Sequence, residues 1–315
     1  MPPVTEHRST LILGTRGSIL AWQQSGWVQT RLQELNPGIA ISLHRIHTSG
    51  DKILDVPLAM VGGKGLFVKE IEDALLRGEI DLAVHSMKDV PTILPVELDI
   101  LCVPIREDPR DALISRDGKT FEQLKLGARV GTSSLRRQAQ LLHSRPDLKI
   151  EMLRGNLDTR LRKLREGRFD AIVLAAAGLK RLAWTQHITE YLPTDISLPA
   201  IGQGALAIEG RRNDVQVREL LSRFDHPPTR TTVLAERAFL HRLEGGCQVP
   251  IAAHAVLEGD RLRLDGLIAS VDGARIIRDT VHGPAVDPER LGIELAEQLL
   301  RQGGDVILKA IYGHA

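Results

Sequence analysis

The sequence predicts an α/β protein with two successive α/β units built on parallel strands, followed by a small C-terminal α+β unit with a three-stranded antiparallel sheet. From residue 11 to residue 199, short apolar strand patterns alternate with helical patterns, which is the order that produces parallel sheets. After Asp225-His-Pro-Pro228 the order changes to one helix, three strands and a last helix. A chain of 315 residues is also long for a single core, so several domains are expected.

The first unit begins with a strand, a helix and a strand. Residues 11–13 are apolar, a helical pattern runs from about Ser18 to Leu35, and residues 39–47 have a strand pattern. Ser18 is the expected N-cap of this helix. Residues 48–66 have no clear period and predict a long functional loop. The remaining elements of this unit are expected at residues 67–77 (helix), 80–84 (strand) and 98–104 (strand).

The second unit follows a connector at residues 106–111. Its elements are expected at residues 129–131, 149–153 and 169–177 (strands) and 160–165 (helix). Residues 200–208 form an apolar run interrupted by glycines, which predicts a strand that returns to the first sheet. We therefore expect a first domain of residues 1–105 with 200–224, a second of residues 106–199 and a third of residues 225–315.

The third unit contains the cysteine with the most suggestive surroundings. Its elements are expected at residues 232–243 and 288–302 (helices) and 250–257, 261–270 and 275–282 (strands). Cys247 lies in the turn between the first helix and the first strand, after Gly245 and Gly246, which leave the sulfur uncrowded. Such a thiolate can carry a covalent group. The alternative is a small buried side chain at a helix end.

The composition excludes several classes of function. The hydrophobic content of 43% and the charged content of 26% are those of an ordinary globular protein. A net charge of +1 and an aromatic content of 3% give no support to binding of nucleic acid or membranes. The two cysteines, Cys102 and Cys247, indicate a reducing compartment. No apolar run has membrane-spanning length, and the first ten residues lack the apolar core of a signal peptide, so we expect a cytoplasmic protein.

Arginines at the ends of predicted strands are the clearest sign of a ligand. Arg136, Arg137 and Arg154 each follow a strand end, where guanidinium groups and free helix N–H groups converge on carboxylates or phosphates. Arg16 and Lys88 follow strand ends in the first unit, so cations are expected on both sides of one cleft. A ligand with several carboxylates fits this layout. Hydroxyl groups for the same ligand, or for helix capping, are expected from Thr132, Ser133 and Ser134.

One carboxylate, Asp89, follows a strand end beside Lys88. It is a candidate for stabilising a transient cation or moving a proton, and the alternative is a salt bridge or a helix cap. The histidines have no metal-ligand spacing, and His85 is a candidate for the core or for supporting the site. Residues 62–65 (Gly-Gly-Lys-Gly) lack the ending of a phosphate-binding loop, so nucleotide binding is rejected.

Seven separated motifs in one order resemble the porphobilinogen deaminase (hydroxymethylbilane synthase) family from about residue 11 to the end. They are Gly14-Thr-Arg-Gly-Ser18, Gly62-Gly-Lys-Gly-Leu-Phe67, His85-Ser-Met-Lys-Asp-Val-Pro91, Val130-Gly-Thr-Ser-Ser-Leu-Arg-Arg137, Leu153-Arg-Gly-Asn156 with Thr159-Arg160, Ile201-Gly-Gln-Gly-Ala205 and Leu243-Glu-Gly-Gly-Cys-Gln-Val-Pro250.

The resemblance implies two domains like periplasmic binding proteins and a third that carries the cysteine. It implies a monomer that condenses four porphobilinogen molecules, with loss of ammonia, on a dipyrromethane cofactor and releases hydroxymethylbilane by hydrolysis. The enzyme would make its own cofactor and hold it by a thioether to Cys247, with Asp89 as the catalytic carboxylate and no metal. Further cofactor contacts are implied at Ser86, Lys88, Thr132, Ser134, Arg136, Arg137, Arg154 and Gly155. Substrate contacts are implied at Arg16, Ser18, Lys64, Phe67, Arg160 and Arg181.

Two positions depart from the family pattern. Met60 replaces a loop lysine found in many members, so Lys64 is expected to contribute more. Trp22-Gln-Gln24 is shifted from the common pattern, and neither glutamine is assigned a role. Two other functions compete with the synthase: an anion-binding protein of the same two-domain architecture, and a thiol-transfer enzyme that uses Cys247. The first leaves the third domain without a task, and the second lacks a histidine near the cysteine in sequence.

Overall fold

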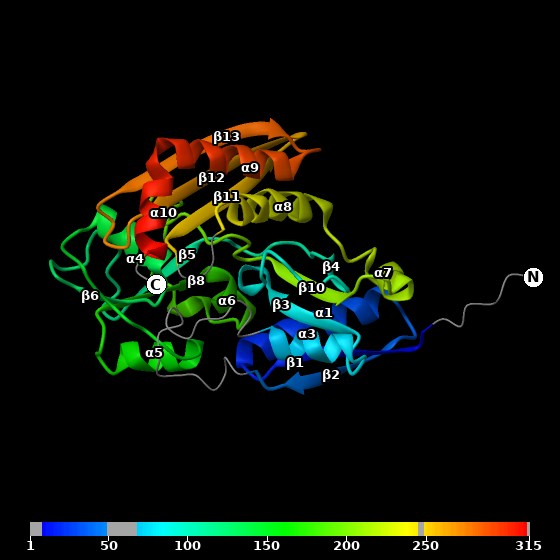
Figure 1. Ribbon diagram of the computed structural model, residues 1–315. Coiled ribbons are helices and arrows are strands. Elements are labelled where there is room, and N and C mark those ends of the chain that lie inside the picture. Colours follow the sequence, from blue (N-terminus) through cyan, green and yellow to red (C-terminus); the bar gives the residue numbers. More distant parts are fainter. Residues whose placement is uncertain (1–7, 49–67, 245–248, 314–315) are drawn as a thin grey trace, which may run out of the picture.

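A computed structural model describes residues 8–48, 68–244 and 249–313, and it contains three sheets (Figure 1). The first sheet has the strand order β2-β1-β3-β10-β4, in which β1 pairs in parallel with β2 and β3, and β10 runs antiparallel to β3 and β4. The predicted return of the chain to this sheet is confirmed. Its strands are β1 (Thr10–Arg16), β2 (Ala40–Ile46), β3 (Leu82–Ser86), β4 (Leu98–Cys102) and β10 (Leu206–Arg211).

The second sheet repeats this topology with the order β7-β6-β8-β5-β9. Again the fourth strand in the order, β5, is antiparallel to the third. Its strands are β5 (Asp111–Ser115), β6 (Arg129–Gly131), β7 (Lys149–Glu151), β8 (Ala171–Ala175) and β9 (Glu190–Tyr191).

Several predicted boundaries are wrong. Asp111 is the first residue of β5 and not the end of a connector. The strand predicted to reach Ala177 ends at Ala175, where a helix begins. The returning strand starts at Leu206, because Gly202 and Gly204 have positive φ angles of 68° and 89° that place them in a turn.

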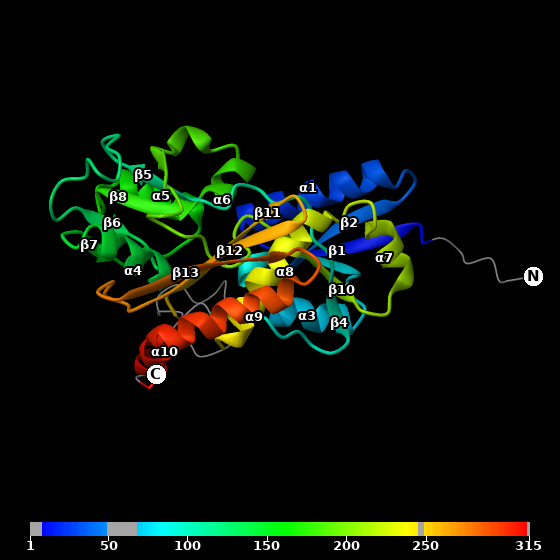
Figure 2. The same cartoon turned by 90° about the horizontal axis from the view of Figure 1, so that it is seen from above.

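Helices cover the two large sheets (Figure 2). The predicted cap of the first helix is confirmed, since the Ser18 hydroxyl accepts a hydrogen bond from the Ala21 N–H at 3.2 Å. The helices are α1 (Ile19–Leu35), α3 (Lys69–Leu76), α4 (Leu135–Ser144), α5 (Leu157–Arg165), α6 (Ala176–Arg181), α7 (Val215–Leu221) and the short 3₁₀ helices Met87–Asp89 and Thr185–His187.

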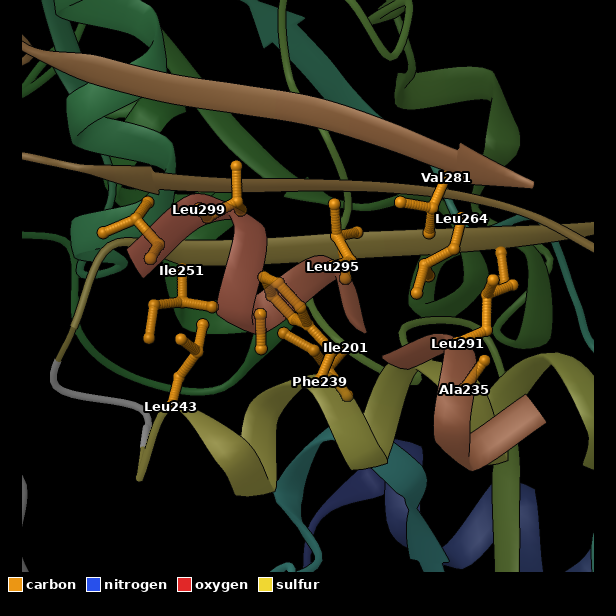
Figure 3. Packing of buried hydrophobic residues seen from close by; sticks show 14 of the residues in the cluster. Ile201, Ala235, Phe239, Leu243, Ile251, Leu264, Val281, Leu291, Leu295 and Leu299 are labelled. Carbon is orange, nitrogen blue, oxygen red and sulfur yellow. The ribbon is translucent and has the colours of Figure 1, made fainter. Parts of the chain in front are cut away.

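The third unit has a three-stranded antiparallel sheet packed on two helices, as predicted, and a further helix that was not predicted follows at its end. Phe239 lies fully buried between the helices and the sheet, beside Leu295 (Figure 3). Its first helix begins earlier than predicted, because a proline pair suits the first helical turn. The elements are α8 (Pro227–Arg242), β11 (Ile251–Glu258), β12 (Arg261–Ala269), β13 (Ile276–Pro284), α9 (Pro288–Leu299), a π-helical turn (Leu300–Gly304) and α10 (Asp305–Tyr312).

One buried carboxylate joins the third unit to both segments that connect the two large sheets. Glu236 of α8 accepts hydrogen bonds from the Arg106 guanidinium at 2.6 and 3.1 Å and from the Gly202 N–H at 2.7 Å. Arg106 belongs to the first connecting segment and Gly202 to the second. The same carboxylate accepts a bond from the Ala255 N–H at 2.9 Å. Glu236 therefore fixes the third unit to the junction of the other two.

Helices α8 and α9 approach so closely that Gly292 has no room for a side chain. A Cβ there would overlap the Ala235 carbonyl and lie 2.8 Å from the Phe239 nitrogen. We expect Gly292→Ala to lower stability by about 1–3 kcal/mol through overpacking. Gly26→Ala, in helix α1 with nothing within 4 Å of the new methyl group, should instead add about 0.5–1 kcal/mol. Thermal unfolding midpoints test this, and equal shifts would contradict it.

Candidate active site

A cleft of about 540 Å³ lies where the carboxyl ends of strands from the first and second sheets face each other. Ten of the predicted site residues line it, five from each α/β unit, so the prediction of one cleft with cations on both sides is confirmed. They are Arg16, Ser18, Ser86, Lys88, Asp89, Arg137, Arg154, Gly155, Arg160 and Arg181.

The described wall of the cleft is strongly cationic. Seven arginine and lysine side chains line it, against two carboxylates, Asp89 and Asp158. The whole chain has a net charge of only +1, so this positive charge is concentrated locally.

The turn after β3 presents Lys88 and Asp89 to the cleft. Met87 between them and the strand is buried, and its N–H donates to the Ala205 carbonyl at 3.0 Å. Gly202 packs against it so closely that a Cβ would lie 2.5 Å from the Met87 Cγ. The buried Met87 therefore anchors the turn to the core. Lys88 is partly buried and Asp89 is exposed, and both line the cleft.

Buried Asp111 fixes Arg137 in the opposite wall. Its Oδ1 accepts hydrogen bonds from Arg137 Nε at 3.0 Å and Nη2 at 2.7 Å, and from the Gln203 amide at 2.9 Å. Its Oδ2 accepts from Ser197 at 2.7 Å and lies 2.8 Å from Arg136 Nη1. Burial alone would raise the pKa of Asp111, but the two guanidinium groups outweigh it and hold the pKa below its usual value. Asp111 is thus a permanent anion that orients Arg137.

The loop after β7 supplies a second pair of arginines, Arg154 and Arg160. Gly155 has a φ of 110°, and a Cβ there would lie 2.7 Å from the Thr159 Cγ2. Its carbonyl accepts a hydrogen bond from Arg160 Nε at 2.7 Å. A glycine is therefore required at 155, and it turns the Arg160 guanidinium across the start of α5.

Three cations of the cleft are held in surroundings that disfavour their charge. Burial lowers the pKa of Lys88, with Asp89 opposing the shift and Arg137 adding to it. Burial lowers the pKa of Arg160 to about 10, and its neighbours Arg137 and Arg154 contribute. Burial also lowers the pKa of Arg181 to about 10, against the opposing effect of Glu107. An anionic ligand would relieve this cost, so the site is suited to a polyanion.

His85 lies below this site as a buried support. Its Nε2 is 2.9 Å from Glu209 Oε2 on the neighbouring strand β10, and both side chains are almost fully buried. The interpretation of His85 as a core residue fits this position. No group of potential ligands able to hold a metal ion occurs among the residues that the structure describes.

Some predicted site residues lie elsewhere. Thr132, Ser134 and Arg136 are not among the residues that line the described wall of the cleft. Ser134 caps α4 by accepting a bond from the Arg137 N–H at 3.4 Å, and Arg136 is buried with Nη1 2.6 Å from the Leu198 carbonyl. Their ligand contacts stay predictions. Cys247, Lys64 and Phe67 lie outside the described residues.

The cleft also contains residues that the sequence argument did not assign. Gln24 is buried and donates from Nε2 to the Ser86 hydroxyl at 3.2 Å. Arg45 is the last residue but one of β2, His47 follows that strand, and Gln203 comes from the returning segment. The carboxyl-end rule that selected Arg16 applies equally to Arg45 and His47, so this signal was present in the sequence.

Comparison with known proteins identifies the family. A family model described as "Porphobilinogen deaminase, dipyromethane cofactor binding domain" matches residues 11–219, and one for the porphobilinogen deaminase C-terminal domain matches residues 230–301. The chain belongs to the porphobilinogen deaminase family. It is 60% identical over 302 residues to the porphobilinogen deaminase of Geobacter sulfurreducens, covering 96% of this chain and 95% of that protein. It is 57% identical to that of Pelobacter propionicus, covering 99% of both.

The porphobilinogen deaminase assignment confirms the predicted dipyrromethane cofactor and the predicted place of the enzyme in tetrapyrrole biosynthesis. Among solved structures, a probable amino-acid ABC transporter extracellular-binding protein from Bacillus subtilis has a TM-score of 0.41 at 11% identity, over 69% of this chain and 90% of that chain. Because this TM-score is low, the fold assignment depends on the observed topology and the family match. No helix in the described parts of the chain has the length and apolar character to cross a membrane.

Proposed function

We propose that the cleft binds the carboxylates of dipyrromethane and of the growing pyrrole chain while porphobilinogen is added one unit at a time. The excess of desolvated cations over carboxylates is the observation that carries this proposal. Each porphobilinogen brings an acetate and a propionate, so every addition increases the negative charge that the cleft must offset. Apart from Asp89, the predicted residues that line the cleft are the proposed binding residues.

Asp89 is the proposed catalytic residue. Loss of ammonia from porphobilinogen leaves an electron-poor azafulvene, and the free α-carbon of the preceding pyrrole attacks its methylene carbon. The new carbon–carbon bond forms in this attack, and the α-carbon then releases its proton to restore the aromatic pyrrole. A carboxylate beside the pyrrole nitrogens stabilises their positive charge and helps to move this proton. The position of Asp89 supports this role. Its carboxylate is exposed in the cleft among cations, and its negative charge opposes the lowering of the pKa of Arg160 in the second unit.

The bound cofactor supplies the first nucleophilic pyrrole, and we propose Cys247 as its point of attachment. The described residues on either side of this segment, Leu243 and Val249, are both buried in the core of the third unit. Glu236 of the same unit is bonded to the junction of the two α/β units. These contacts hold the third unit against the two α/β units, which supports an attachment point that stays in place while the chain grows. A covalent origin also keeps each intermediate in the enzyme between additions.

A mass spectrum of the intact protein tests this attachment. We expect the wild-type protein, expressed in a cell that makes porphobilinogen, to carry the mass of a dipyrromethane. Cys247→Ser should lack this mass and have no turnover, while Cys102→Ser should keep both. Cys102 is fully buried in the first sheet and serves as the matched control. An unmodified wild-type mass would contradict the proposal and favour the alternative of a non-covalent anion-binding protein.

We also propose three domains with the bounds 1–105 with 200–224, 106–199 and 225–315, in a cytoplasmic monomer without nucleic-acid partners. The strand composition of the three sheets supports these bounds. The low cysteine content supports a reducing compartment. Light scattering of the purified protein tests the oligomeric state, and a dimer mass would contradict a monomer.

A further inference from the structure

Arg45 lines the cleft at the end of the edge strand β2, outside the set of residues assigned from the sequence. In the order of the first sheet, β2 neighbours β1, and β1 neighbours β3, whose end leads to Asp89. Strands are spaced by about 4.8 Å, so the end of β2 lies roughly 10 Å along the sheet from the end of β3. Arg45 thus marks the outer end of a row that begins at Asp89 and passes Arg16.

The Arg45 side chain is held in place although it is exposed. Its Cζ lies 5.2 Å from the centroid of the Trp22 ring, within cation–π distance. Its Cδ lies 3.6 Å from the position that a Cβ would have at Gly17, so its stem rests on the turn between Arg16 and Ser18. Trp22 itself is 40% exposed, which is unusual for so large an apolar ring and leaves it free to support the guanidinium.

The growing chain has more carboxylates than the rest of the cleft has cations, which indicates a binding role for Arg45. Apart from Arg45, six arginine and lysine side chains line the described wall. Each condensation adds an acetate and a propionate, so the carboxylates of the full-length chain outnumber these six cations. Because each condensation takes place beside Asp89, the pyrroles already joined have to leave that position as the chain grows, and Arg45 offers them a cation at the outer end of the row.

We infer that Arg45, supported by Trp22, binds a carboxylate of the pyrrole chain during the later additions and not during the early ones. This inference depends on the proposed function, because it needs a chain that grows in the cleft. Arg45 and Trp22 would then determine the rate of the later additions but not that of the early ones.

The experiment follows covalent intermediates by intact mass after a short pulse of porphobilinogen. For Arg45→Gln we expect normal cofactor loading and a first addition within about twofold of wild type. A later addition should slow by about fivefold, as for an exposed charge pair, so that partly elongated enzyme accumulates. Arg45→Lys should recover part of the rate. Trp22→Leu should give a weaker version of the Arg45→Gln pattern.

Arg31→Gln is the matched control, because this exposed arginine lies on the same helix as Trp22 and pairs with Glu34 at 2.5 Å. At high salt the wild-type contact is screened, so the difference between Arg45→Gln and wild type in the rate of the late addition should become smaller. An Arg45→Gln intermediate pattern identical to wild type, or a defect already at the first addition, would overturn the inference. Wild-type enzyme without any pyrrole mass would instead overturn the proposed function, so the two failures are distinguishable.

Discussion

Asp89→Asn should keep its fold and its covalent cofactor but lose turnover by about 10²–10⁴-fold. The amide has nearly the shape of the carboxylate, and the side chain is exposed in the cleft, so folding should be little affected. It cannot carry the negative charge that stabilises a cationic pyrrole nitrogen, nor accept a proton. Steady-state turnover measures the loss, while the intact mass and the circular dichroism spectrum show that the holoenzyme is folded.

Asp158 provides the control, because it is the other carboxylate in the described wall of the cleft. It lies in the first turn of α5, where a negative charge stabilises the helix. Asp158→Asn should therefore reduce turnover only slightly, and Asp89→Glu should keep a small residual activity. Near-normal turnover in Asp89→Asn would remove Asp89 from the mechanism.

Arg137→Leu should block cofactor assembly or chain growth, so that most of the purified protein either lacks the dipyrromethane mass or carries it without elongating. The variant removes the cation that Asp111 orients toward the cleft, and it also leaves Asp111 with fewer partners. Loss of one partner of a buried ion pair typically costs about 3–5 kcal/mol, so the unfolding midpoint should fall as well. Arg136→Leu should have the same outcome, because Arg136 shares the Asp111 carboxylate.

Arg145→Leu separates lost stability from lost binding. Arg145 caps the opposite end of α4 and has a comparable set of bonds, to Asp147 and to the carbonyls of Phe121 and Leu124. It is not among the residues that line the cleft. We expect this variant to be less stable but fully loaded. If Arg137→Leu assembled its cofactor and elongated normally, the carboxylate-binding role of Arg137 would be wrong.

The sequence was most informative where local chemistry and burial agree. The first strand, helix and strand could be predicted because apolar runs alternate and Ser18 marks a helix start. The cleft could be predicted because Arg16, Lys88 and Arg154 each lie at or soon after the end of a strand, and parallel strands bring their carboxyl ends together. Both arguments need only residues that are close in sequence.

Strand β5 was missed because its first residue is an aspartate within a charged stretch. Aspartates are usually exposed, and only the fold brings Asp111 together with Arg137, Ser197 and Gln203. Sequence could not separate Arg136 from Arg137 either. They are adjacent, and only the packing of α4 turns one toward Leu198 and the other into the wall of the cleft.

The path of the chain through the first sheet limits how the protein can be divided. Strand β10 lies between β3 and β4, yet it is synthesised about a hundred residues after β4, when the whole second sheet has already emerged. A fragment that stops at residue 105 would therefore expose two unpaired strand edges in the middle of its sheet. Only a rearranged chain that supplies residues 206–211 directly after β4 would allow the first unit to exist by itself.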